Sequence, residues 1–419
     1  MREMRESGVE WIGEIPVSWQ ILTIGSVFKV RNEKVNDTDY PPLSVTKGGV
    51  VPQMENVAKS DANDNRKMVL SNDFVINSRS DRKQSCGVSP MDGSVSLINT
   101  VLYPANGAPV IPAYLNYLLK NYGFAEEFYR WGHGIVADLW TTRWQEMKSI
   151  LLPIPSIGEQ QQILEAISEK TDKVDTLIAN VQTQIEKLRD YKQSVITEVV
   201  TKGLDPTVPM KDSCVEWIGE IPAHWGVTRI KNMFELWNER NDEADLTKVN
   251  LISLYTDLGV VQHSDLTATT GNRAVTAEGY KIVRKHDIVV NIILCWMGAV
   301  GMSQYDGVTS PAYDIYRPLK DTNSEYYHYL FRTNRFNGEC YRYGRGIMMM
   351  RWRTYSTEFR AINIPCPPAE EQKKIVTHLN EKCNKIDQLI AIKQAKIEKL
   401  EQYKRSLIYE YVTGKKEVR

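Results

Sequence analysis

The stretch Val9-Glu-Trp-Ile-Gly-Glu-Ile-Pro16 occurs twice, because the same letters return at residues 215–222. A second match follows in the same order, since Asp73-Phe-Val-Ile-Asn77 is echoed by Asp287-Ile-Val-Val-Asn291. The distance between the copies is far longer than the roughly 20–50 residues of a solenoid repeat. The chain is therefore predicted to be a duplication, in which each half is a globular domain plus a further element.

That further element is a long segment without proline or glycine at the end of each half. Leu152-Pro-Ile-Pro155, followed by Glu159 and Gln160, matches Ile364-Pro-Cys-Pro367, followed by Glu371 and Gln372. Apolar residues then recur at spacings of three and four, the pattern of a coiled-coil seam. The first copy has Leu164, Ile167, Val174, Ile178, Val181, Ile185, Leu188, Val195 and Val199, and the second has Val376, Leu379, Cys383, Ile386, Ile390, Ile397, Leu400, Leu407 and Tyr411.

Two lysines, Lys192 and Lys404, interrupt this seam at equivalent places. Either they pair with carboxylates and define the register of the helices, or they extend toward solvent. A narrow apolar seam needs a partner, and an antiparallel pairing of the two helices would place one domain at each end. The alternative is that each helix joins another protein chain.

These patterns predict an α+β fold with pseudo-twofold internal symmetry, in which a long antiparallel two-helix coiled coil separates two globular domains. The expected segments are a first domain at 1–158, a spacer helix at 159–205, a second domain at 206–369 and a C-terminal spacer helix at 370–419. Within the domains, strands are predicted at 74–77, 95–98 and 287–294. One amphipathic helix is predicted at 112–131 and another at 324–343.

Composition favours an ordinary globular protein, with 42% hydrophobic and 25% charged residues. The longest apolar run, 288–300, is interrupted by Asn291 and Gly298, so no membrane span is expected. Six scattered cysteines and a polar N-terminus without a signal peptide favour reduced thiols and a cytoplasmic protein. The net charge of zero argues against nucleic-acid binding unless basic residues are concentrated locally.

Together, the duplicated motifs resemble one family over essentially the whole chain, the specificity subunits of type I restriction-modification enzymes. The resemblance is carried by the G-E-I-P-x-x-W starts at 13–19 and 219–225, the Y-R-x-G-x-G-I segments at 129–135 and 341–347, and the Pro-rich helix openings. It implies two target-recognition domains that each read one half of an asymmetric, bipartite double-stranded DNA sequence. The helices would be the spacer between them.

The resemblance also implies partners. Two adenine-N6 methyltransferase subunits would dock on the helices, and motor-nuclease (restriction) subunits would join them. S-adenosylmethionine, Mg²⁺ and ATP would be bound by those partners, with no cofactor and no metal in this chain. The sequence agrees, because it contains no N/D-P-P-Y/F motif, Walker loop, H-E-x-x-H motif or Cys/His cluster. The chain is therefore expected to have no catalytic residues.

Two other functions compete with this interpretation. A two-headed coiled-coil scaffold would bind proteins rather than DNA. A duplicated nuclease would need matching acidic clusters in the two halves. Asp73 and Asp287 do match, but no second acid and lysine follow both at similar spacing.

Candidate DNA contacts gather around the two Gly-x-Gly loops, 132–134 and 344–346, where paired glycines would let the backbone approach a phosphate. Arginines follow the second loop with a single acid, Glu358, among them, and aromatic residues are interleaved. Arginine is also the commonest reader of guanine in the major groove. The full set of candidates is Arg79, Arg82, Lys83, Arg130, His133, Arg143, Arg273, Arg342, Arg345, Arg351 and Arg353. Trp11 and Trp217 are expected to be core anchors.

Overall fold

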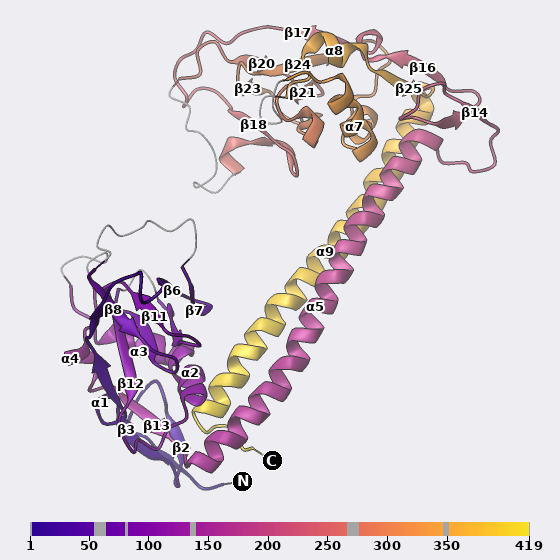
Figure 1. Cartoon of the computed structure of the whole chain (residues 1–419). Helices are drawn as coiled ribbons and strands as arrows, with labels where there is room; N and C mark the ends of the chain where they lie inside the picture. Colours follow the sequence, from indigo (N-terminus) through magenta and orange to yellow (C-terminus); the bar gives the residue numbers. More distant parts are fainter. Residues whose placement is uncertain are drawn as a thin grey trace. The chain divides into compact units, whose positions relative to one another are not determined.

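The chain folds into two compact units in the computed structural model, which describes residues 2–53, 64–79, 83–134, 140–265, 276–346 and 352–418. Unit 1 consists of Met1–Gln182 with Gln394–Arg419, and unit 2 consists of Thr183–Lys393 (Figure 1). Each unit therefore contains one globular domain and a part of both long helices. The four segments expected from the sequence stay a prediction, because this division follows a different criterion.

Each half ends in a long helix, as the sequence predicted. Helix α5 spans Ile157–Lys202 and helix α9 spans Ala369–Val412. Helix α5 begins just after the Pro153–Pro155 break, and the residue after its end, Gly203, has a φ of 78°. Glycine adopts this left-handed conformation without steric cost, so it ends the helix.

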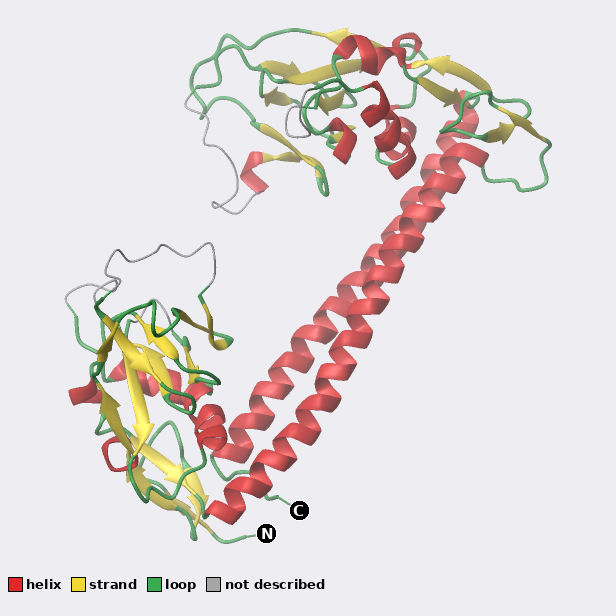
Figure 2. Ribbon diagram, viewed as in Figure 1, coloured by secondary structure: helices red, strands yellow, loops and turns green. Residues whose placement is uncertain are grey.

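The parts of α5 and α9 within each unit lie side by side (Figure 2) and are antiparallel. In unit 1, the ammonium of Lys404 lies 2.6 Å from the carboxylate of Asp175. In unit 2, Lys192 lies 2.7 Å from Asp387, and Lys393 donates to the side chain of Gln184. Both seam lysines thus pair with carboxylates, at equivalent positions of the two helices.

Replacing Lys404 by alanine is expected to lower the free energy of unfolding by about 0.5–1 kcal/mol, because both members of the pair are partly exposed and solvent screens their attraction. Exchanging the charges, with Lys404→Asp and Asp175→Lys together, should recover most of the loss. Urea unfolding of the full chain measures the difference, with Lys399→Ala, an exposed lysine of the same helix, as control. A double variant no more stable than Lys404→Asp alone would contradict the pairing.

The domain of unit 1 is built on a four-stranded antiparallel sheet in the order β10-β9-β12-β4, with β4 at Phe28–Arg31, β9 at Phe74–Asn77, β10 at Cys86–Val88 and β12 at Asn99–Pro104. Helices α2 (Pro112–Lys120) and α3 (Tyr122–Arg130) follow β12. The other elements are β1 (Met4–Glu6), β2 (Glu14–Pro16), β3 (Gln20–Thr23), α1 (Ile24–Val27), β5 (Lys34–Val35), β6 (Leu43–Thr46), β7 (Gly49–Pro52), β8 (Arg66–Val69), β11 (Gly93–Val95), α4 (Trp144–Met147) and β13 (Leu151–Ile154).

The domain of unit 2 has the corresponding four-stranded sheet, β17-β24-β21-β22, with β17 at Phe234–Trp237, β21 at Ile288–Asn291, β22 at Val300–Met302 and β24 at Tyr313–Pro318. Helices α6 (Ser324–Phe331) and α7 (Asn334–Tyr343) follow β24. The other elements are β14 (Met210–Asp212), β15 (Glu220–Pro222), β16 (Gly226–Arg229), η3 (Ile230–Asn232), β18 (Ile252–Tyr255), β19 (Gly259–Gln262), η4 (His263–Asp265), β20 (Lys281–Val283), η5 (Cys295–Met297), β23 (Gly307–Thr309), α8 (Ser356–Ala361) and β25 (Asn363–Cys366).

Local structure differs from the sequence prediction in two strands and in both amphipathic helices. The strand at 74–77 is confirmed, but the one predicted at 95–98 is wrong beyond Val95, because a turn separates β11 from β12. The strand predicted at 287–294 ends at Asn291, whose side chain accepts the backbone N–H of Ile293.

The two amphipathic helices are each a pair of shorter helices. Asn121 ends α2 and caps α3 by accepting from Phe124, and Thr333 caps α7 by accepting from Phe336. Side-chain capping satisfies backbone N–H groups that a helix start leaves without partners.

The core of each unit is formed by its sheet, its helix pair and the adjoining ends of α5 and α9. In unit 1, Trp19 and Tyr114 pack with Ile163 of α5 and Leu407 of α9. Trp11, predicted as a core anchor, is 8% exposed and contacts Phe124 edge to face. Its equivalent Trp217 is partly buried against the core of unit 2. Among the described residues, no helix has the length and apolar character needed to cross a bilayer.

Candidate nucleic-acid interface

The second Gly-x-Gly loop, at 344–346, follows α7 and pairs with residues 352–354, and these two described segments are here called the hairpin of unit 2. Arg345 and Arg353 exchange two backbone hydrogen bonds, of 2.8 and 2.9 Å, and so close its base. The ring of Trp352 stacks on Tyr341, with 5.0 Å between ring centroids, and its indole N–H donates to the carbonyl of Tyr341 at 3.0 Å. The hairpin is thereby held against the last turn of the helix.

Unit 1 repeats this arrangement with different exposed side chains. His133 and Thr141 exchange the two backbone hydrogen bonds, of 3.0 and 3.1 Å. Trp140 stacks on Tyr129 at 5.7 Å and donates to its carbonyl at 2.9 Å. At the central position of the loop, the exposed residue is therefore histidine in unit 1 and arginine in unit 2.

The first glycine of each loop has a packing role that the sequence did not reveal. A Cβ on Gly132 would overlap the indole of Trp140, and one on Gly344 would overlap the indole of Trp352. Both glycines are buried, whereas the central residue is exposed. The tryptophan ring alone therefore explains why glycine is needed at this position. That the loop backbone also approaches a DNA phosphate stays a prediction.

The arginines of unit 2 carry less uncompensated charge than the sequence suggested. Arg342 donates to Glu339, which is 5% exposed, at 2.8 Å, and this hydrogen bond raises the pKa of Arg342. Arg345, whose side chain is 76% exposed, lies 3.1 Å from Glu358. Glu339 is therefore a second acid in the cluster. Arg353 is half-buried at the hairpin base.

In unit 1, two of the candidates form ion pairs on the surface of α3. Lys83 pairs with Glu126 at 3.0 Å, and its ammonium lies 4.2 Å from the ring centroid of Tyr129. Arg130 lies 2.8 Å from Glu10. Each ion pair therefore includes a residue of α3, the helix that carries the stacked Tyr129.

The remaining candidates divide into two groups. Arg79, in a backbone bridge with Thr141, lies beside the hairpin base, and exposed Arg143 follows the hairpin at the start of α4. Arg82, Arg273 and Arg351 lie outside the described residues. The structure thus brings Arg79, Lys83, His133 and Arg143 around one hairpin.

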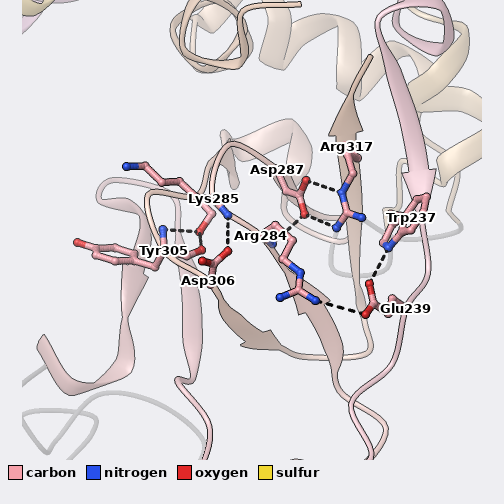
Figure 3. A network of polar contacts seen from close by, with 9 residues as sticks. Trp237, Glu239, Arg284, Lys285, Asp287, Tyr305, Asp306 and Arg317 are labelled. Carbon is pink, nitrogen blue, oxygen red and sulfur yellow. Dashed lines mark hydrogen bonds and ion pairs between the residues drawn. The ribbon is translucent and has the colours of Figure 1, made fainter. Parts of the chain in front are cut away.

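A second basic feature of unit 2 is a turn that the sequence prediction passed over. Arg284, Lys285 and His286 are consecutive, exposed and immediately N-terminal to Asp287 and β21. Arg284 and Lys285 are drawn in Figure 3. The three successive basic residues in the sequence could have predicted this basic surface. The equivalent turn of unit 1 is Leu70-Ser71-Asn72, without charge. Since the backbone of Ile292 accepts from Thr354, the hairpin adjoins the other end of β21, so the two basic features are not brought together.

The matched acids of the two halves form ion pairs within the sheets. Asp287, 1% exposed, accepts two hydrogen bonds of 3.1 Å from Arg317 and one of 2.8 Å from the backbone of Arg284 (Figure 3). Asp73 accepts from Arg31 at 2.7 and 3.1 Å, which raises the pKa of Arg31. Bidentate arginine pairs occupy these carboxylates, so they have a structural role rather than that of a nuclease site.

The fold matches solved chains at low sequence identity. One of them, from work on complex assembly and conformational transition of the type I R-M system, aligns with a TM-score of 0.65 and 13% identity, over 95% of this chain and 98% of that one. The fold is therefore shared with that chain. Within the part of the sequence the structure describes, no cluster of three potential metal ligands occurs.

Sequence comparisons find similarity to one family. Residues 222–402 match the model of the type I restriction modification DNA specificity domain. Two similar proteins are from Methanocaldococcus jannaschii. The putative type I restriction enzyme MjaX specificity subunit is 24% identical, over 96% of this chain and 95% of its own length, and the MjaVIII specificity subunit is 25% identical, over 64% and 62%. Residues 222–402 therefore carry the features of this DNA specificity domain, and the chain is similar to type I specificity subunits over almost its whole length.

Proposed function

We propose that this chain recognises an asymmetric, bipartite double-stranded DNA sequence, with one half-site read by each unit. The match of residues 222–402 to a DNA specificity domain supports DNA recognition. The observation that carries the bipartite proposal is that equivalent surfaces of the two units present different side chains. His133 corresponds to Arg345 in the loops, and the uncharged turn at 70–72 corresponds to the basic turn at 284–286. Two readers of one fold with different contact residues suit a target without twofold symmetry.

Two adenine-N6 methyltransferase subunits are the proposed partners, one for each unit. Leu177 and Tyr403 of unit 1 are 47% and 52% exposed, and the equivalent Leu389 and Tyr191 of unit 2 are 48% and 49% exposed. Exposed apolar groups repeated at equivalent helix positions are suited to binding the same partner twice. Motor-nuclease subunits would join for restriction in the cytoplasm, with S-adenosylmethionine, Mg²⁺ and ATP bound by the partners and no catalysis by this chain.

The first test is single-molecule sequencing of N6-methyladenine in cells that carry this chain with its neighbouring methyltransferase. Cells that lack only this chain are the control. The expected result is an asymmetric motif with a non-specific gap that vanishes with the chain. Unchanged methylation by an active methyltransferase would contradict the proposal. It would favour the alternative, a two-headed coiled-coil scaffold that binds proteins.

Salt dependence separates the two functions. A protein that neutralises Z phosphates loses DNA affinity with a log–log slope of about −0.9Z, because counterions are released on binding. We expect such a slope for the complex with methyltransferase. A protein-binding scaffold would have no salt-dependent affinity for DNA.

Replacing Arg345 by alanine is expected to weaken binding to the half-site of unit 2 by about 1–3 kcal/mol if the guanidinium reads a base. Arg345→Lys distinguishes a base contact from a phosphate contact, because lysine keeps the charge but loses the bidentate geometry. Affinity is measured for duplexes in which one half-site at a time is altered. Arg229→Ala, an exposed arginine on β16, is the matched control. Equal affinity of the Arg345→Ala variant and the wild type would remove the loop from the interface.

A further inference from the structure

Each Gly-x-Gly hairpin is attached to the end of its helix by two side chains of the segment that pairs with the loop, 140–142 in unit 1 and 352–354 in unit 2. In unit 2, the hydroxyl of Thr354 donates to the carbonyl of Cys340 at 2.9 Å, beside the bond from Trp352 to Tyr341. In unit 1, Thr142 donates to Phe128 at 2.7 Å, beside the bond from Trp140. The last carbonyls of a helix have no partners within it, so these bonds satisfy groups that otherwise need water.

The two tryptophans are not core residues. Trp140 and Trp352 are half-buried, and neither belongs to the hydrophobic clusters of its unit. Their rings cover the buried first glycine of the loop and leave the central residue exposed. Each ring therefore packs on the hairpin and on the end of the helix rather than in the core of the domain.

The attachment is common to both units, but the groups around it differ. The face of Tyr129 is covered by the ammonium of Lys83 in unit 1. In unit 2, Trp296 contacts Tyr341 edge to face, with 5.8 Å between ring centroids. The exposed central residue also differs, as His133 and Arg345. A shared support with different exposed groups is the arrangement expected for two readers of different sequences.

We propose that Trp140 and Trp352 are positioning residues for DNA recognition, each of which holds the central side chain of one Gly-x-Gly loop in place for one half-site. This inference rests on the proposed function. The rings would not touch the bases themselves. The tryptophan rings restrict the loops before binding, so less conformational entropy is lost when His133 or Arg345 contacts DNA. Removing one ring therefore lowers discrimination in one half-site and leaves the other half-site unchanged.

The test uses the full chain in complex with methyltransferase and compares Trp352→Ala and Trp140→Ala. Affinity is measured for a duplex that contains the motif found by N6-methyladenine sequencing, and for duplexes in which either half-site is scrambled. Trp352→Ala should reduce discrimination of the unit 2 half-site roughly tenfold, and Trp140→Ala that of the unit 1 half-site, within the range of one base-reading contact. Trp131→Ala removes an exposed indole next to the same loop, outside the stack, and should leave both unchanged.

Two further variants keep the test valid if the alanine proteins fold poorly. Trp352→Phe keeps an aromatic ring for stacking but loses the indole donor, and should recover part of the discrimination. Thr354→Val keeps the ring and removes the other attachment, and should reduce discrimination in the same half-site. A purely structural role would lower the melting temperature without changing the ratio between cognate and scrambled half-sites.

The outcomes separate this inference from the function on which it rests. If the wild type discriminates between cognate and scrambled half-sites and all tryptophan variants keep the same affinity ratio, the positioning role is overturned and the proposed function stands. Equal losses in both half-sites would also overturn the positioning role. If the wild-type complex does not discriminate between sequences, the proposed function fails, and the positioning role fails with it.

Discussion

Replacing Arg317 by tyrosine is expected to lower the free energy of unfolding of unit 2 by about 3 kcal/mol, because it leaves the carboxylate of Asp287 buried without its charge partner. Asp287 is 1% exposed and accepts both of its side-chain ion-pair bonds from Arg317. The guanidinium also lies 4.2 Å from the ring centroid of Trp237 (Figure 3).

Unit 1 contains the same cluster with two positions exchanged. Its arginine, Arg31, is at the end of β4, where unit 2 has Trp237 on β17. Its aromatic residue, Tyr103, is on β12, where unit 2 has Arg317 on β24, and the strands pair in the same register. Arginine and ring lie diagonally across each strand pair, within reach of one another.

This exchange provides a matched rescue. Adding Trp237→Arg to Arg317→Tyr recreates the order of unit 1 and should recover most of the lost stability. Urea unfolding followed by circular dichroism measures the three proteins, with Arg284→Ala as control. Arg284 is 54% exposed and lies 3.5 Å from Glu239, so its loss should cost less than about 1 kcal/mol. A double variant as unstable as Arg317→Tyr would show that the two arrangements are not interchangeable.

Exchanging residues 24–150 for those of a relative is expected to replace one half of the methylated motif completely and leave the other half unchanged. The two ends of the exchanged segment lie next to each other, because the backbone N–H of Ile24 donates to the carbonyl of Ile150 at 2.9 Å. It contains the four-stranded sheet and the hairpin of unit 1. Strands β3 and β13 and both long helices stay native, so the exposed helix residues proposed to bind partners are unchanged.

Unit 2 offers the matching experiment. Ile230 donates to the carbonyl of Ile362 at 3.0 Å, at the equivalent position, so residues 230–362 form the corresponding segment. Their exchange should change only the other half of the motif. Sequencing of N6-methyladenine measures both. Changes in both halves after either exchange would contradict independent reading by the units.

Local sequence predicted the elements whose signals lie within one segment. The Pro-rich breaks, Gly203 and the three-four spacing of apolar residues predicted helices close to the observed α5 and α9. The breaks in the shorter helices had a local signal too, because Asn121 and Thr333 favour N-caps, but the amphipathic pattern continued across them. The ion pair of Arg342 with Glu339, three residues earlier on one helix, was also within reach of the sequence.

The sequence by itself predicted the duplication, the two long helices and their equivalent lysines, because periodicity and repeated motifs are properties of the chain. Only the tertiary structure decided which groups meet across elements. It paired Lys404 with Asp175, Arg345 with Glu358 and Arg317 with Asp287. It also placed Trp352 over Gly344, which gives this glycine a packing role. Such contacts depend on strand register and helix packing, which bring together residues that the chain separates and that carry no mark of each other in the sequence.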